Sequence, residues 1–193
     1  MIENPKEFWN TRWEAGQTGW DIGSCAPAFM DYFSNSIAKN ASILIPGCGN
    51  AHEAEFLLSV GYTNITLIDI APKAVDHLNE KFGNNSNIHI ICGDFFEHQG
   101  QYDYLLEQTF FCAINPALRS DYVKKAHAIL RPKGKIIAVL FDRSFEGGPP
   151  FGGSKNEYIE LFTPYFKITS LETNQRSIPQ RMGTEVFGVF EKG

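Results

Sequence analysis

Short runs of apolar residues alternate with longer amphipathic stretches through the middle of this chain. Such runs are typical of strands that are buried on both faces, whereas the stretches between them have the spacing of helices. Because neighbouring parallel strands need a crossover connection, the alternation predicts a mostly parallel sheet flanked by helices. The expected strands cover residues 42–45, 65–70, 88–92, 102–107, 136–141, 166–172 and 185–190.

Helices are expected between these strands, and two more are expected before the first strand. Pro72 stands where a helix can begin, and Gly61 stands where the preceding helix can end. Together the elements predict an α/β fold, with a seven-stranded, mostly parallel sheet and helices on both faces. The expected helices cover residues 5–15, 27–37, 50–60, 71–82, 117–130 and 156–162.

A glycine-rich turn follows the first expected strand. Gly47 and Gly49 let the backbone turn sharply and leave no side chain between it and a ligand. The third glycine of the dinucleotide fingerprint is missing, since His52 stands at that position. Asp69, at the end of the second strand, can accept hydrogen bonds from both hydroxyls of a ribose. An adenosine without a pyrophosphate, such as S-adenosylmethionine, fits this pattern, and an ordinary strand–helix turn is an equal alternative.

Acidic and aromatic residues follow the third and fourth expected strands. Asp94 and Phe95 come after the third strand, and Glu107 ends the fourth. Because the carboxyl ends of parallel strands form the binding edge of such sheets, these residues should lie beside Gly47 and Asp69. Asp94 could bind the exocyclic amine of an adenine on which Phe95 stacks. The alternative is a solvated turn followed by a core phenylalanine.

All three tryptophans lie near the start of the chain. Trp9 and Trp13 are one helical turn apart, and Trp20 follows a glycine-containing turn. Residues 1–38 are therefore expected to form a helical cap over the ligand site, with an electron-rich wall that suits a sulfonium cation. A lid helix that only packs on the core is the alternative.

Two features of the second half of the chain are candidates for acceptor binding. Arg119 lies in the first turn of a helix, where a cation opposes the helix dipole. It could bind an anionic partner or form a surface salt bridge. Residues 146–153 contain four glycines and two prolines, which suggests either a shaped loop near the site or a flexible linker.

Composition narrows the class of protein. The 193 residues suit one domain, 1–193, and a net charge of −5 without a basic stripe makes a nucleic acid partner unexpected. No apolar window is long enough to span a membrane and no signal layout opens the chain, so we expect no membrane association and a cytoplasmic location. We also expect a monomer. The cysteines and histidines are not clustered, so no metal is expected and Cys48 is expected to be a packing residue.

Several motifs together resemble the thiopurine S-methyltransferase family, and come closest to its halide and thiol methyltransferase branch. These motifs are Phe8-Trp9 with Trp13, residues 45–49, residues 109–116 with Arg119, residues 131–134 and residues 147–151. The family often has Glu where this chain has Asp69, and the branch has Glu where it has Asn115. The resemblance implies a Rossmann-like class I methyltransferase fold that uses S-adenosyl-L-methionine and releases S-adenosyl-L-homocysteine.

The resemblance also implies roles for individual residues. Arg119 would lie close to the acceptor, and Glu107 and Thr109 would lie near the methionine part of the cofactor. Cofactor contacts are implied for Trp9, Trp13, Trp20, Gly47, Asp69, Asp94 and Phe95.

The reaction that the resemblance implies needs little acid–base help. Methyl transfer from a sulfonium is an in-line displacement, and halide ions, bisulfide, thiocyanate and thiolates arrive already anionic. We therefore expect transfer to a small anionic or thiol acceptor. Three alternatives are a thiopurine or aromatic thiol S-methyltransferase, a nicotinamide-dependent oxidoreductase, and an adenosyl-binding protein without catalysis.

Overall fold

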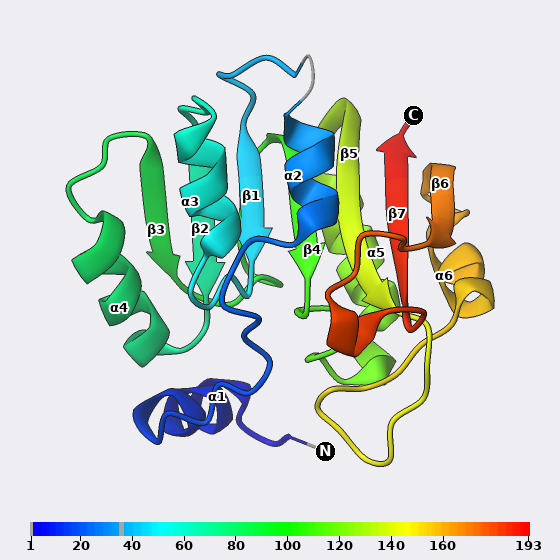
Figure 1. Ribbon diagram of the computed structural model, residues 1–193, viewed down its shortest axis with the longest axis horizontal. Helices are drawn as coiled ribbons and strands as arrows, with labels where there is room; N and C mark the ends of the chain where they lie inside the picture. Colours follow the sequence, from blue (N-terminus) through cyan, green and yellow to red (C-terminus); the bar gives the residue numbers. More distant parts are fainter. Residues whose placement is uncertain (1, 35–36) are drawn as a thin grey trace.

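The computed structural model describes residues 2–34 and 37–193, and its strands and helices alternate along the chain (Figure 1). The elements are α1 (Pro5–Glu14), α2 (Pro27–Phe33), β1 (Ile43–Pro46), α3 (His52–Ser59), β2 (Ile65–Asp69), α4 (Pro72–Phe82), β3 (Ile88–Cys92), β4 (Tyr102–Gln108), the 3-10 helix η1 (Pro116–Leu118), α5 (Arg119–Ile129), β5 (Leu130–Phe141), α6 (Lys155–Phe162), β6 (Phe166–Thr173), the 3-10 helix η2 (Pro179–Arg181) and β7 (Glu185–Lys192).

The seven strands form one sheet in the order β3-β2-β1-β4-β5-β7-β6. Strands β1 to β5 pair in parallel, and β7 runs antiparallel to both of its neighbours. The order reverses between β1 and β4, and in open α/β sheets ligands bind outside the carboxyl ends of the strands at such a reversal. The predicted seven-stranded, mostly parallel sheet is confirmed.

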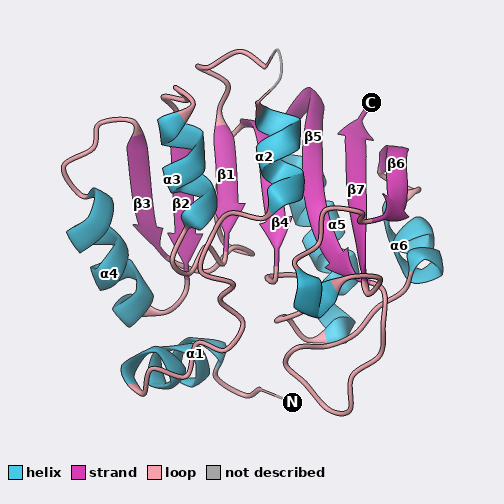
Figure 2. Ribbon diagram, in the orientation of Figure 1, coloured by secondary structure: helices cyan, strands magenta, loops and turns pink. Residues whose placement is uncertain are grey.

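Helices cover both faces of the sheet (Figure 2). Phe29 and Phe33 of α2 pack with the apolar sides of α3 and α4 in one buried cluster. Tyr122 of α5 and Phe162 of α6 belong to the cluster on the opposite face, where the Phe162 ring stacks on Phe190 with 4.1 Å between centroids. The central strands are therefore buried on both sides, which explains why most of their residues are apolar.

Several predicted boundaries differ from the structure, and three of the differences concern β5, α5 and α2. Strand β5 begins at Leu130 rather than at residue 136, because both Leu130 and Lys135 pair with β4 on either side of a register shift. The helix expected at 117–130 begins at Arg119, after the 3-10 turn that the Asn115 side chain caps. Helix α2 ends at Phe33 rather than at residue 37, and residues 35 and 36 lie outside the described residues.

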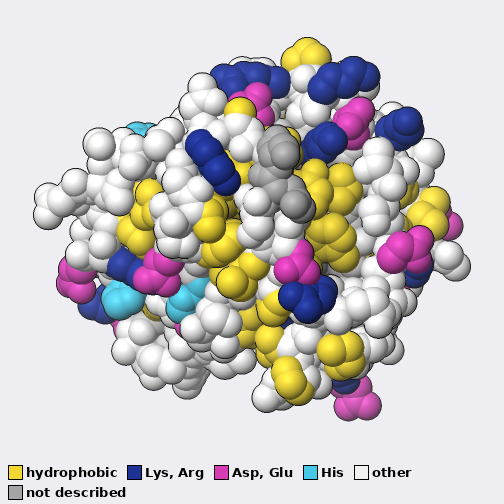
Figure 3. All heavy atoms as spheres, turned by 45° about the horizontal axis from the view of Figure 1, so that its top comes forward, with side chains coloured by type: hydrophobic (Ala, Val, Ile, Leu, Met, Phe, Trp, Pro, Cys, Tyr) yellow, Lys and Arg dark blue, Asp and Glu magenta, His cyan; other side chains and the backbone are white. Residues whose placement is uncertain are grey.

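Helix α1 lies across the carboxyl ends of the strands, at the lower edge of Figure 1, and contributes no fully buried residue. Its Asn10 side chain accepts a hydrogen bond from the Lys73 amide of α4 at 2.8 Å. On the face drawn in Figure 3, basic and acidic side chains are interspersed. Within residues 2–34 and 37–193, no helix is both long and apolar enough to cross a membrane.

Candidate active site

A cavity of about 700 Å³ lies between α1 and the carboxyl ends of the parallel strands. Its walls come from the α1 cap, the turns after β1 to β4, the loop after β5 and the segment around η2. Nine of the predicted site residues line it, namely Trp9, Trp13, Trp20, Gly47, Gly49, Asp69, Asp94, Phe95 and Thr109. Two others, Glu107 and Arg119, do not.

The turn after β1 is shaped for close approach of the backbone. Gly47 and Gly49 have φ values of 54° and 52°, a conformation that glycine adopts without steric cost. A Cβ on Gly47 would lie 2.4 Å from Cδ2 of Phe110, so the ring occupies the space that a side chain would need. At Gly49 the nearest atom to such a Cβ would be Cζ2 of Trp13, at 3.5 Å. Gly47 is therefore needed for packing as well as for the turn, whereas at Gly49 only the backbone conformation favours glycine.

The Asp69 side chain links the turn after β1 to the turn after β2. One carboxylate oxygen accepts from the Gly49 amide at 3.1 Å, and the other accepts from the Ala71 amide at 2.9 Å. Burial raises the pKa of Asp69 above its ordinary value, and these backbone hydrogen bonds oppose that rise. Each oxygen has the capacity to accept a further hydrogen bond, and Asp69 lines the cavity.

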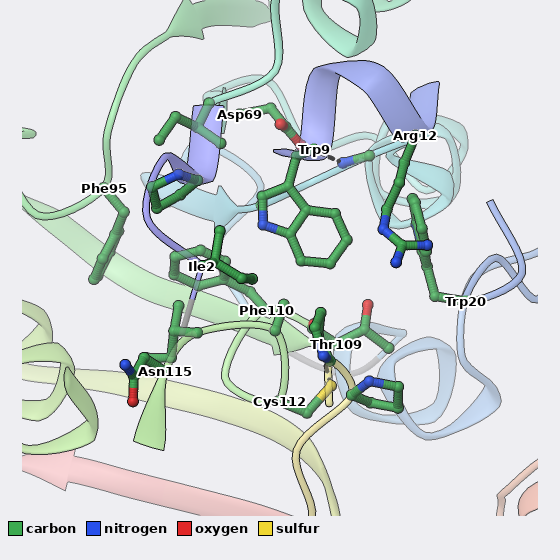
Figure 4. A pocket seen from close by; sticks show the side chains of 18 of the residues that line it. Ile2, Trp9, Arg12, Trp20, Asp69, Phe95, Thr109, Phe110, Cys112 and Asn115 are labelled. Carbon is green, nitrogen blue, oxygen red and sulfur yellow. Dashed lines mark hydrogen bonds between the residues drawn. The ribbon is translucent and has the colours of Figure 1, made fainter. Parts of the chain in front are cut away.

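The three tryptophans form an edge-to-face cluster over the cavity. The Trp9 and Trp20 rings are 5.3 Å apart at 88°, and the Trp13 and Trp20 rings are 6.2 Å apart at 66°. Figure 4 shows Trp9 and Arg12 reaching into the cavity from α1, across from Phe110. The cap therefore contributes an aromatic wall of the site.

Two side chains that the sequence analysis missed tie this cap to the rest of the molecule. Asp21 accepts hydrogen bonds from Asn50, and from Nε2 of His52 at 2.9 Å if that nitrogen is protonated. Arg181 donates to the Trp20 carbonyl at 2.9 Å. No local pattern marks either residue, because their partners are 29 to 161 positions away in the sequence.

Glu107, which the resemblance places near the methionine part of the cofactor, lies beneath the cavity and not in its wall. Its Oε1 accepts from the amides of Phe110 and Phe111 at 3.0 and 2.8 Å, and its Oε2 accepts from the Tyr122 hydroxyl at 2.8 Å. Burial raises the pKa of Glu107 to about 7. The carboxylate supports the turn that follows β4.

Arg119 is also placed differently from the prediction. Its side chain is only 4% exposed, and its guanidinium donates to Glu157 at 2.5 Å and to the Gly152 carbonyl at 2.8 Å. The same group lies over the Phe111 ring, 4.8 Å from the centroid. Arg119 therefore anchors the loop whose Pro149 lines the cavity, and Arg119 itself does not line that cavity.

The buried cysteines near the site are unsuited to act as nucleophiles. Burial raises the pKa of Cys112 to about 12 and the pKa of Cys48 well above its ordinary value, so both stay protonated near neutral pH. The Cys112 thiol donates to the Thr109 carbonyl at 3.3 Å. Among the described residues, no group of three or more His, Cys, Asp or Glu side chains could hold a metal ion.

A sequence model of the thiopurine S-methyltransferase family matches residues 4–192. The chain belongs to this family. A probable thiol methyltransferase 2 of Arabidopsis thaliana is 31% identical, in a match that covers 100% of this chain and 88% of the relative. Thiocyanate methyltransferase 1 of Brassica oleracea is 29% identical, in a match that covers 95% of this chain and 84% of the relative. A thiopurine S-methyltransferase of Pseudomonas fluorescens is 25% identical, with 86% and 85% covered.

Solved structures share the fold. The 1,6-didemethyltoxoflavin-N1-methyltransferase of Burkholderia thailandensis aligns with a TM-score of 0.75 at 18% identity, over 100% of this chain and 92% of that one. The predicted class I methyltransferase fold is thus confirmed, and this member of the thiopurine S-methyltransferase family is an S-adenosylmethionine-dependent methyltransferase. Family membership decides against the nicotinamide-dependent oxidoreductase and the non-catalytic binding protein.

The cavity fits the cofactor of this family. Its volume is within the usual range for sites that enclose a small molecule. The glycine turn lets backbone approach the ligand, the Asp69 carboxylate could accept from the ribose, and the tryptophan cluster could face the sulfonium. Asp94 is exposed at the rim, and Phe95 is buried beside it. Asp94 could therefore bind the exocyclic amine of an adenine, and Phe95 could pack against the face of its ring.

An Asp69→Asn variant is expected to bind S-adenosylhomocysteine about tenfold more weakly, because a neutral amide is a weaker acceptor for hydroxyl groups than a carboxylate. Calorimetric titration measures the change. Asp69→Glu is the matched control, since it keeps the charge and should bind within about threefold of the wild type. Wild-type affinity in the Asn variant would show that this carboxylate does not hold the ribose.

Proposed function

We propose that this enzyme transfers a methyl group from S-adenosylmethionine to a small sulfur nucleophile or halide ion that reaches the site already as an anion. The acceptors of this class are thiolates, bisulfide, thiocyanate and iodide. One observation carries the proposal. Among the described residues that line the cavity there is no His, Lys, Tyr or Glu, and the only carboxylates are Asp69 and Asp94 at the cofactor edge.

The absence of a base from the described part of the wall favours acceptors that need no deprotonation. In-line displacement at a sulfonium methyl group requires alignment of the acceptor rather than proton transfer. An anion in an apolar cavity loses part of its hydration shell, which makes it a stronger nucleophile. Phe110, Phe141 and Phe145 supply apolar walls for this purpose.

Arginines supply the positive charge on the other walls of the cavity. Arg12, Arg143 and Arg181 all line it, and each guanidinium lies over an aromatic ring, 4.5 to 5.3 Å from the centroid. Arg181 is fixed most firmly, since it also donates to the Trp20 carbonyl and contacts Glu185 at 3.4 Å. It is therefore a better candidate than Arg119 for attracting an anionic acceptor.

When bound, the cofactor supplies an activated methyl group, and the chain's own residues supply position and environment. The tryptophan cap and the glycine turn would enclose the cofactor, while Arg181 could hold the acceptor anion. Because no protein group has to exchange a proton with thiocyanate or a halide, release of the methylated product would leave the site unchanged in charge. The names of the relatives, thiol and thiocyanate methyltransferases, support the same acceptor class.

A thiopurine or aromatic thiol is the second candidate acceptor. The cavity volume of about 700 Å³ and its aromatic walls would accommodate a planar ring beside the cofactor. More distant relatives at 25% to 28% identity are named as thiopurine S-methyltransferases or probable ones. Such an acceptor would still react as its thiolate.

Formation of S-adenosylhomocysteine tests the proposal. Purified enzyme is supplied with S-adenosylmethionine and, in separate reactions, bisulfide, thiocyanate, iodide, an aliphatic thiol and an aromatic thiol. We expect turnover with at least one of the small anions. Turnover restricted to the aromatic thiol would favour the second candidate, and cofactor binding without turnover on any acceptor would contradict both.

An Arg181→Met variant is expected to raise the KM for thiocyanate about tenfold, because it removes the most firmly held positive charge from the cavity wall. Arg181→Lys should lose much less affinity. Arg176→Met is the matched control, since Arg176 pairs with Asp31 and does not line the cavity. Steady-state kinetics at saturating cofactor measure all three, and an unchanged KM in Arg181→Met would exclude this role for Arg181.

A further inference from the structure

Glu107 has no role in the transfer proposed above, yet its buried carboxylate is held by three hydrogen bonds directly beneath the cavity. We propose that Glu107 is a positioning residue of the cofactor site. In its ionised form it holds the turn after β4, which presses the Phe110 ring against Gly47. The inference rests on the cofactor of the enzyme and is independent of the acceptor.

The turn after β4 contains a backbone conformation that is unfavourable for the residue that adopts it. Thr109 has φ of 62°, which is unfavourable for a β-branched residue. Such a conformation persists only where the surrounding structure enforces it. The amides of the next two residues, Phe110 and Phe111, both donate to the same oxygen of Glu107. That oxygen therefore fixes the backbone at the point where Thr109 is strained.

Phe110 connects this turn to the cofactor site, because its ring lines the cavity beside Gly47. Its ring fills the space beside Gly47 that a Cβ would occupy, and it lies 5.4 Å from the Phe95 ring and 6.0 Å from the Tyr122 ring. Figure 4 shows Phe110 in the cavity, with Thr109 beside it. Tyr122 supports the arrangement twice, since its hydroxyl donates to Glu107 and its ring packs under Phe95 and Phe110.

The charge state of Glu107 decides how strongly it holds the turn. A carboxylate is a stronger acceptor for two amides than the carbonyl oxygen of a carboxylic acid. Burial raises the pKa of Glu107 to about 7, so both forms are populated near neutral pH. The titratable or charged groups that face it are the Tyr122 hydroxyl, the Cys112 thiol and, around one small internal cavity, Tyr158, Arg181 and Glu185. Of these, only Tyr122 donates a hydrogen bond to the carboxylate.

Binding of S-adenosylhomocysteine at different pH values tests the proposal without any acceptor. The three tryptophans all lie in the cap, so their fluorescence reports on the ligand. We expect the wild-type affinity to fall about tenfold between about pH 8.5 and about pH 6. Glu107→Gln, which cannot ionise, should bind with the weaker affinity throughout this range. Titration of the ligand itself is common to all variants and cancels in the comparison.

Two further variants distinguish the positioning role of Glu107 from the effect of removing any buried carboxyl group. Tyr122→Phe removes a donor that stabilises the carboxylate, so the midpoint of the pH dependence should rise by about one pH unit. Glu53→Gln is the matched control, because Glu53 is buried and accepts from the Ala26 amide but does not line the main cavity. It should keep the wild-type pH dependence.

Thermal unfolding of the same variants gives a readout of stability. Because burial raises the pKa of Glu107 above its unfolded value, its contribution to folding stability falls as pH rises from about 4.5 to about 7. Glu107→Gln should therefore be at least as stable as the wild type at about pH 8, although it binds the ligand more weakly. The proposal is overturned if Glu107→Gln keeps the wild-type pH dependence, if it binds as tightly as the wild type at about pH 8.5, or if Tyr122→Phe leaves the midpoint unchanged.

Discussion

A Gly47→Ala variant is expected to lose at least about a hundredfold in affinity for S-adenosylhomocysteine, equivalent to about 2.7 kcal/mol. The new Cβ would lie 2.4 Å from the Phe110 ring, on a residue whose φ is 54°. Either the glycine turn or the turn after β4 must move, and both line the cofactor cavity. Calorimetric titration gives the affinity, and circular dichroism shows whether the fold is kept.

Gly61→Ala is the matched control for this substitution. Gly61 has φ of 91°, so an alanine there meets the same kind of backbone strain, but nothing lies within 4 Å of the added Cβ. This variant should lose stability and keep its affinity. If both variants bound the ligand equally well, the contact between Gly47 and Phe110 would have no part in shaping the site.

An Arg119→Ala variant is expected to lower the free energy of unfolding by about 2 to 3 kcal/mol, since removing one partner of a largely buried ion pair leaves the other without compensation. Glu157 is partly exposed, which limits the loss. The melting temperature should fall by about 5 to 10 °C. Activity should fall as well, because the freed loop carries Pro149 and Pro150 of the cavity wall.

Glu157→Gln provides the comparison for Arg119→Ala. It keeps the hydrogen bond from Arg119 and loses only the charge, so it should cost about 1 kcal/mol and leave most of the activity. Thermal unfolding and kinetics at saturating cofactor measure both variants. A rise in acceptor KM without any loss of stability in Arg119→Ala would instead support the prediction from the family resemblance that Arg119 lies close to the acceptor.

The fold was largely predictable because the central strands are buried on both faces. Apolar runs such as Ile43–Pro46 of β1 and residues 136–141 of β5 carry that information locally. The start of β5 was not predictable, since residues 131–134 have the composition of a turn. Only pairing with β4, on both sides of a register shift, keeps them in the strand.

Site residues were predictable where the order of the strands alone determines their position. They were not predictable where the direction of the side chain determines whether they reach the cavity. Gly47, Asp69 and Asp94 follow parallel strands, so their convergence on one cavity follows from the topology. Glu107 ends a strand in the same way, but its carboxylate turns into the core to meet the amides of the next turn. Arg181 comes from a distant segment, and nothing in the local sequence indicates that it reaches the cap.

The pH dependence of kcat/KM for a series of thiols tests transfer to a preformed anion most directly. The measurement is made at saturating S-adenosylmethionine in the Glu107→Gln background, so that titration of Glu107 cannot contribute. If the acceptor must arrive ionised, the apparent pKa of the profile will move with the pKa of each thiol, and thiocyanate will give a flat profile between about pH 6 and 9. One common apparent pKa for every thiol would reveal a base supplied by the protein, and would contradict the proposed mechanism.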